Sequence, residues 1–194
     1  MATDSYVAFI PYDGSPLKAE SQVDMSKNNE ALAQEDLKSL AQNQQVFEIE
    51  EYNFNVEQTL NIGSQSSGPG AGKIKFNEFS ITRKIDRASP TLFDMACSGT
   101  AFKQVILALR KSAGGMTAGQ VFLRFDFKLV AVKTISWEHD EESPKETVTF
   151  EYGGMLIRYC QQNADGSLQS PIAGGWNGIK NVQDHTPTPI RAKN

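Results

Sequence analysis

The run GPGAGK at residues 68–73 is the part of this sequence that comes nearest to a phosphate-binding loop. A P-loop needs a glycine five residues before Gly72 and a serine or threonine directly after Lys73. Its backbone amides cradle phosphates, and the hydroxyl binds the magnesium ion. Ser67 and Ile74 occupy those two positions, and a strand pattern follows instead of a helix pattern. The run therefore does not predict nucleotide binding.

Side chains that bind metals or act as nucleophiles are few and scattered. His139 and His185 lie far apart, and the only two cysteines, Cys97 and Cys160, lack metal-ligand spacing. The acidic run at 138–142 has no EF-hand pattern and is typical of a solvated hairpin tip. No G-x-S-x-G nucleophile motif occurs. We expect no enzyme activity, no metal site and no cofactor, and we expect both thiols to be buried and reduced.

Length and charge limit the class of protein further. The 194 residues correspond to one domain or a compact pair, and they suffice to bury a core without disulfides. The net charge of −4 argues against a general nucleic-acid-binding protein. No apolar run approaches the roughly 20 residues of a membrane span, and the N-terminus lacks the features of a signal peptide. We expect no nucleic-acid partner, no membrane insertion and synthesis in the cytoplasm.

Most of the chain has strand patterns, and three long strands change their apolar phase. The changes fall at Glu50–Glu51, between Phe76 and Phe79, and at Gly153–Gly154. Because a strand alternates its side chains between two faces, a phase change requires a bulge, a bend or a change of buried face. Strands of this kind turn corners in barrels and orthogonal sandwiches. The sequence therefore predicts a mainly β fold, a two-sheet β-barrel with bulged long strands.

One short α-helix, at about 89–98, is expected to flank this barrel. Ser89 is expected to accept a hydrogen bond from the first helical turn, Pro90 suits the first helical position, and Gly99 suits the end. The strand at 102–110 is apolar on both faces, which indicates that the helix covers one of them. The polar segment 23–45 has no strand pattern and is expected to be a long excursion loop, partly helical.

Four motifs occur in order between Ser5 and Asn181: GAGKIKFNEFSITRKIDRASPTLF, VILALRKSAG, VTFEY followed by MLIRYCQQNADGS, and AGGWN. The Ile85–Pro90 corner is among the most specific parts. Together they resemble the haemolysin-coregulated protein (Hcp) family, the tube subunits of bacterial type VI secretion systems. Some features depart from that family. The 23–45 excursion is longer and more helical than its usual loop, the tail after Asn181 is extended, and Asn177 stands where aspartate is expected.

The resemblance implies an Hcp-like β-barrel domain at 1–181, followed by a polar tail at 182–194. It implies homohexameric rings that stack into a hollow tube, inside a contractile sheath and under a spike protein. The tube would assemble in the cytoplasm, leave the cell without a signal peptide and carry secreted effectors in its lumen. Two alternatives stay open: a related contractile-injection or phage-type tail tube subunit, and a monomeric ligand-binding β-barrel.

Two surfaces follow as hypotheses for the assembly. Polar rows opposite apolar ones are expected to face the lumen: Ser80, Thr82, Lys84, Arg124, Asp126 and Lys128. The excursion is expected to contact the neighbouring ring, because it has too few apolar side chains to order itself alone. The expected ring-stacking residues are Met25, Leu32, Leu37 and Leu40. The alternative is that this segment is a mobile loop without a partner surface.

Overall fold

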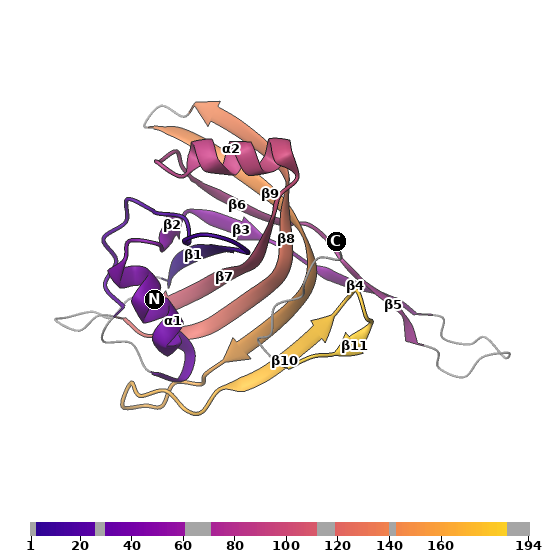
Figure 1. The fold of residues 1–194 in the computed structure, drawn as a ribbon. Helices are drawn as coiled ribbons and strands as arrows, with labels where there is room; N and C mark the ends of the chain where they lie inside the picture. The colour runs from indigo at the N-terminus through magenta and orange to yellow at the C-terminus, as the bar shows by residue number, and fades with distance from the viewer. Residues whose placement is uncertain (1–2, 26–29, 61–70, 112–118, 140–142, 186–194) are drawn as a thin grey trace, which may run out of the picture.

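The computed structural model describes residues 3–25, 30–60, 71–111, 119–139 and 143–185. The elements in chain order are β1 (Thr3–Pro11), α1 (Glu30–Gln42), β2 (Phe47–Ile49), β3 (Glu51–Asn53), β4 (Val56–Leu60), β5 (Ala71–Phe76), β6 (Phe79–Lys84), α2 (Ser89–Ser98), β7 (Ala101–Lys111), β8 (Val121–His139), β9 (Pro144–Tyr159), β10 (Ile172–Asn177) and β11 (Val182–Gln183). The prediction of a mainly β fold is confirmed (Figure 1). Residues 68–70 of the GPGAGK run, residues 140–142 of the acidic run and residues 186–194 of the tail lie outside the described residues.

One curved antiparallel sheet forms the barrel. Its strand order is β11-β10-β9-β8-β7-β1-β2, and β6 and β3 extend it from the first half of β9. The chain bends at Glu50 between β2, which pairs with β1, and β3, which pairs with β6. The Glu50 N–H donates to the Thr82 carbonyl at 2.9 Å. The phase change predicted at Glu50–Glu51 is therefore a corner, and this corner brings the two ends of the sheet together.

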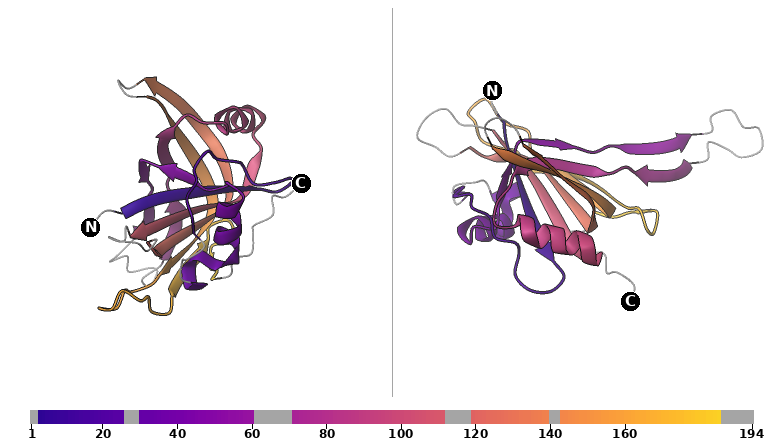
Figure 2. Two further views of the ribbon diagram at one scale, coloured as in Figure 1. Left: turned by 90° about the vertical axis from the view of Figure 1, so that its left-hand side faces the viewer. Right: turned by 90° about the horizontal axis from the view of Figure 1, so that it is seen from above.

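The second sheet is a ribbon of two strands, β4 and β5, which extends away from the barrel (Figure 2). The phase change predicted between Phe76 and Phe79 marks the place where the chain leaves this ribbon and enters the barrel as β6. The two sheets are thus a wrapped barrel sheet and a projecting ribbon, because the strands change sheet at this point and at Asn55.

The third predicted phase change involves two neighbouring strands. On β9, Tyr152 belongs to the main core, and Met155, three residues further on instead of two, packs against the same core. On β8, the same three-residue step lies between the core residues Phe127 and Val130. Between the latter two, Leu129 has a positive φ of 50°, which is uncommon for a leucine. Both strands therefore rotate at the same row, and the prediction at Gly153–Gly154 is confirmed.

Aromatic side chains fill the inside of the barrel. The fully buried members are Phe9, Phe47, Phe79, Phe102, Phe127 and Phe150. The ring centroids of Phe79 and Phe127 lie 4.1 Å apart, and those of Phe9 and Phe150 lie 5.8 Å apart. Helix α2 packs Leu92 and Met95 onto this core. Its predicted span is confirmed, and Gly99 ends it with a φ of 67°.

A second core lies on the outside of the barrel, under α1. Leu32 and Leu37 of α1 pack there with Ile106 and Ala108 of β7 and Tyr6 of β1. Strand β7 is therefore covered on both faces, as its sequence indicates. The helix that covers its outer face is α1 instead of the expected α2.

The fold continues past the expected domain boundary at residue 181. Val182 and Gln183 form β11, which pairs with Asn177 and Trp176 of β10. The Asp184 carboxylate then lies 3.6 Å from the ammonium group of Lys128. The first residues of the expected tail therefore belong to the barrel.

Candidate interaction surfaces

The outer face of β3, β6 and the adjoining halves of β8 and β9 carries polar side chains, mostly serine and threonine with some glutamate and lysine, and we call it the bare face. It consists of Glu51, Asn53, Ser80, Thr82, Lys84, Thr134, Ser136, Glu138, Lys145, Thr147 and Thr149, which lie opposite one another in the strand register. Every one of these side chains is at least partly exposed. The Thr82 and Thr147 hydroxyls lie 3.1 Å apart across the strands.

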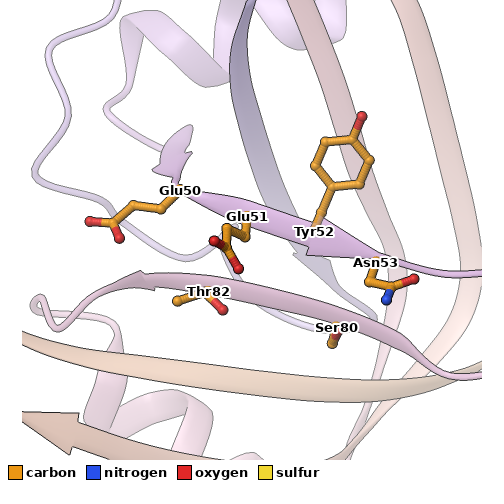
Figure 3. Close-up of a pocket in the computed structure, with 6 residues that line it drawn as sticks. All are labelled: Glu50, Glu51, Tyr52, Asn53, Ser80 and Thr82. Atoms are coloured by element: carbon orange, nitrogen blue, oxygen red, sulfur yellow. The ribbon is translucent and has the colours of Figure 1, made fainter.

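An open groove of about 470 Å³ follows one edge of the bare face, lined by Glu50, Glu51, Tyr52, Asn53, Ser80 and Thr82 (Figure 3). The side chains of Ser80 and Thr82 lie on the same side of the sheet as Glu51, and Tyr52 points away from them. The Lys145 ammonium group pairs with the Glu50 carboxylate at 2.9 Å. Three of the expected lumen residues, Ser80, Thr82 and Lys84, therefore lie together on an accessible polar surface.

The other expected lumen residues are buried, and that part of the hypothesis is wrong. Arg124, Asp126 and Lys128 are 1%, 0% and 3% exposed. The reason is that α1 and the C-terminal segment cover the face of β8 that carries them. Lys128 has Asp184 as its partner, and Arg124 and Asp126 belong to a charge network under α1.

This network, which we call the covered cluster, consists of Asp36, Gln104, Arg124, Asp126 and Arg158. Asp126 Oδ1 accepts hydrogen bonds from Arg124 Nε at 2.9 Å and from Gln104 Nε2 at 2.7 Å, and its Oδ2 accepts one from Arg158 Nη2 at 2.7 Å. Arg124 and Arg158 face each other across β8 and β9. The carboxylate between them thus offsets a repulsion that like charges on opposite strands would cause.

Arg124 also holds α1 on the barrel. Its two terminal nitrogens donate to the two carboxylate oxygens of Asp36 at 3.0 and 2.7 Å, and Nη1 donates to the Leu32 carbonyl at 3.2 Å. Burial lowers the pKa of Arg124, but the charges of Asp126 and Asp36 outweigh burial and raise it. For Asp36, burial raises the pKa, but the hydrogen bonds and the charge of Arg124 outweigh burial and lower this pKa below its ordinary value of 3.8. A bidentate guanidinium–carboxylate pair of this kind is geometrically specific.

The expected ring-stacking residues are buried within their own protomer. Met25, Leu32, Leu37 and Leu40 are 0%, 0%, 1% and 7% exposed and belong to the second core. The segment does need a partner surface to order itself, but the outer face of its own barrel supplies that surface. The hypothesis that these four side chains dock on a neighbouring ring is therefore wrong.

The corner between β6 and α2 contains a second buried network, the corner cluster, formed by Arg83, Asp86, Ser89 and Glu146. Arg83 Nη2 lies 2.7 Å from Glu146 Oε1, and its Nη1 lies 2.9 Å from Asp86 Oδ1. Ser89 Oγ donates to Glu146 Oε1 at 3.0 Å and accepts from the Asp86 N–H at 3.2 Å. Ser89 is thus buried at the first helical position and makes no side-chain cap on the first turn. The expected N-cap is wrong, because this network uses the hydroxyl.

The cysteines and possible metal ligands form no site among the described residues. Cys160 is a buried free thiol whose pKa is raised by burial, whereas Cys97 is free but exposed on α2, against expectation. The described ranges contain no group of three or more histidine, cysteine or acidic side chains that could hold a metal ion. None of the helices described here is long and apolar enough to cross a membrane.

Sequence reasoning missed the covered cluster, although two signals for it were present. Strand β7 has a second apolar face, at Ile106 and Ala108, and the 23–45 segment has an apolar stripe without a partner. Matching the two would have placed α1 on the barrel. The partner of Arg124, by contrast, lies 88 residues away in the chain at Asp36, and no local spacing indicates such a pair.

Comparison with known proteins assigns the chain to a family. A family model described as the type VI secretion system effector Hcp matches residues 38–159. Protein hcp1 of Pseudomonas aeruginosa is 31% identical over 112 residues, which cover 57% of this chain and 69% of that protein. A solved structure of a type six secretion system protein has a TM-score of 0.74 at 22% identity, covering 94% of this chain and 100% of its own.

The fold is also that of Hcp1 from Salmonella typhimurium, with a TM-score of 0.64 at 24% identity over 95% of this chain and 100% of that one. The family model alone spans well over half of the sequence. The chain therefore belongs to the Hcp family of type VI secretion system proteins.

Proposed function

We propose that this chain is the tube subunit of a type VI secretion system and acts as a homohexameric ring that stacks into a hollow tube. Family membership supports the tube role. The observation that carries the proposal is the bare face, an accessible sheet surface of polar side chains on the outside of a packed barrel. The phenylalanine-filled interior argues against a barrel with an interior ligand pocket.

The bare face is proposed to line the lumen, with Ser80, Thr82 and Lys84 among its lining residues. Short hydroxyl side chains suit a wet channel, because they are hydrated without partners and give a passing protein no apolar surface to adhere to. The buried Arg124, Asp126 and Lys128 have no part in this lining.

The contact between rings is proposed to involve the β4–β5 ribbon in place of the 23–45 segment. The ribbon projects from the barrel (Figure 2), whereas α1 is packed on it. Two strands alone are marginally stable in water, so the ribbon gains from a partner surface. Val56 is 40% exposed, and Ile74 and Phe76 are half-buried, which leaves apolar area on the ribbon for such a contact.

In this assembly the tube is proposed to be enclosed by a contractile sheath, to sit under a spike and to be secreted with effectors in its lumen. The description of the matched family as a secretion system effector supports export. Export of an assembled tube would proceed without a cleaved signal peptide.

Light scattering after size-exclusion chromatography, followed by electron microscopy, tests the assembly. We expect the mass of a hexamer, ring-shaped particles and tubes at high protein concentration. A protein that stays monomeric at high concentration, without rings, would overturn the proposal.

The lumen assignment has its own test. A cysteine introduced at Lys84 is compared with one introduced at Asn43, which is exposed at the end of α1. Both variants have a Cys97→Ser background, in which the buried Cys160 is the remaining native thiol. On assembly into tubes, the Lys84→Cys protein should lose its reactivity towards a large polyethylene glycol maleimide but keep it towards a small maleimide. The Asn43→Cys protein should keep both, and equal behaviour of the two sites would contradict the assignment.

A further inference from the structure

The ribbon joins the barrel at two asparagines, and an aromatic residue lies next to each. Strand β4 leaves the barrel after Asn55, and β5 returns to it before Asn77, whose N–H donates to the Asn55 carbonyl at 3.1 Å. Phe54 precedes the first asparagine and Phe76 precedes the second. Both rings therefore lie at the base of the ribbon, where it joins the barrel.

Phe54 is fixed by the main core. Its ring centroid lies 4.9 Å from that of Phe125 and 5.2 Å from that of Phe127, both in edge-to-face arrangements. Such arrangements are favourable for aromatic pairs. The β4 side of the base is thus held by the barrel wall itself.

Phe76 also packs on the main core, and it contacts in addition a part of the chain that is distant in sequence. Its ring lies 5.2 Å from that of Tyr152, and it also contacts the turn after β10 at Gly178. A Cβ atom at Gly178 would lie 2.6 and 2.8 Å from two carbons of the Phe76 ring, which is closer than real contacts allow. Gly178 is not among the described glycines with positive φ. The glycine is therefore needed there for space rather than for backbone conformation.

The turn that carries Gly178 cannot easily move aside. The Gly178 N–H donates to the Gly153 carbonyl at 2.9 Å. The buried Asn177 accepts hydrogen bonds at Oδ1 from the backbone of Ile179 at 3.1 Å and of Lys180 at 3.0 Å. A Cβ atom at Gly178 would also lie 3.1 Å from the Gly153 carbonyl oxygen, a tight contact, but its closest clashes are with the Phe76 ring. We therefore expect an added side chain to displace mainly this ring.

We propose that Gly178 is a positioning residue: it shapes the seat of Phe76 and thereby sets the direction of the ribbon. The C-terminal hairpin of the barrel, distant in sequence, thus controls the projecting element. The claim that the ribbon direction governs ring stacking rests on the proposed function. The claim that this direction depends on Gly178 is independent of the proposed function.

Distances between two spin labels test the first step. One label is placed on the exposed native Cys97 and the other on Glu57→Cys, an exposed ribbon position, with labelled protein diluted into unlabelled protein. In Gly178→Ala the main distance should shift. The matched control is Gly174→Ala in β10, where a Cβ would lie at an ordinary 3.6 Å from Ile157 Cγ2, and it should leave the distance unchanged.

A smaller side chain at position 76 provides the rescue. In the double variant Gly178→Ala with Phe76→Leu, the added methyl group has room, so the distance should return towards that of the wild type, a coupling that independent sites would not show. Phe76→Ala alone removes the seated ring without overpacking and should broaden the distance distribution. If Gly178→Ala fails to fold, the distance distribution of Phe76→Ala tests the proposal in its place. Unchanged distances in either single variant would overturn the proposal.

The functional step is measured separately, as the amount of tube that sediments from purified protein. Gly178→Ala should lower tube formation about tenfold, which corresponds to about 1.4 kcal/mol, and the double variant should restore it. If the wild-type protein forms no rings, the proposed function fails and the label distances still decide the role of Gly178. If distances shift while tube formation stays normal, the link from ribbon direction to stacking is overturned.

Discussion

The covered and the bare halves of the barrel surface have the same strand pattern and opposite environments. On β8, Arg124 and Asp126 alternate with core phenylalanines and lie under α1. On β6, Ser80 and Thr82 alternate with the buried Phe79 and stay accessible. Alternation therefore identifies which residues share a face of a strand, and it does not tell whether another element covers that face.

The side-chain chemistry of the two halves differs in a way that matches their environments. The covered half has long charged side chains, which are held by several mutual hydrogen bonds because buried charges need partners. The bare half has many serine and threonine hydroxyls, which water satisfies. The two halves thus differ in their share of hydroxyl side chains, because both contain charges of both signs.

The largest effect should come from removing the central carboxylate of the covered cluster. Asp126→Asn removes the negative charge between two buried guanidinium groups and replaces one of its two acceptor oxygens by an NH2 donor, so the unfolding free energy should fall by about 3–5 kcal/mol. The matched control is Glu51→Gln on the exposed bare face, which should change it by less than about 0.5 kcal/mol. Chemical denaturation measures both, and similar losses at the two sites would contradict the assignment of covered and bare halves.

Local sequence signals predicted the elements well where the cause is local. The span of α2 follows from Pro90 and Gly99, and the corner at Glu50 follows from a phase change that any strand would have to accommodate. These features depend on backbone geometry within a few residues. These features could be predicted without knowing which elements pack against one another.

The features that could not be predicted depend on distant partners. Ser89 has the residue type of an N-cap, yet Glu146, 57 residues away, accepts a hydrogen bond from its hydroxyl. Leu32 and Leu37 looked like an exposed docking stripe because the apolar outer face of β7 lies far along the chain. In both cases the residue pattern was interpreted correctly as needing a partner, and only the fold supplies its identity.

Replacing Ser89 in α2 or Ser80 in β6 by alanine tests the same comparison, and the larger loss of stability should be of intermediate size. Ser89→Ala removes a buried hydroxyl that bridges Asp86, Arg83 and Glu146, so it should lower the unfolding free energy by about 1–3 kcal/mol. Ser80→Ala on the bare face should change it by less than about 0.5 kcal/mol. In a Glu146→Gln background the Ser89→Ala loss should shrink, because the two residues share one network. An undiminished loss there would point to a helix cap after all.

The smallest expected effect concerns the ion pair that joins α1 to the covered cluster. The Asp36 side chain is 40% exposed, so solvent screens its pair with Arg124, and Asp36→Asn should lower the unfolding free energy at neutral pH by about 1 kcal/mol or less. Burial raises the pKa of Asp36, and the Arg124 hydrogen bonds and charge more than reverse this, so the folded-state pKa lies below 3.8. The unfolded chain then binds the proton more readily than the folded protein around pH 4.

The sign of the pH dependence follows from that difference. The contribution of Asp36 is fully present above its ordinary pKa of 3.8 and is lost as pH falls through its lower folded-state pKa. The difference in unfolding free energy between the wild type and Asp36→Asn should therefore be constant from neutral pH to about pH 5 and shrink below it. A difference that grew on acidification would mean that Arg124 does not hold this carboxylate, and the covered half would then be joined to α1 by apolar packing and the Arg124 hydrogen bond to the Leu32 carbonyl.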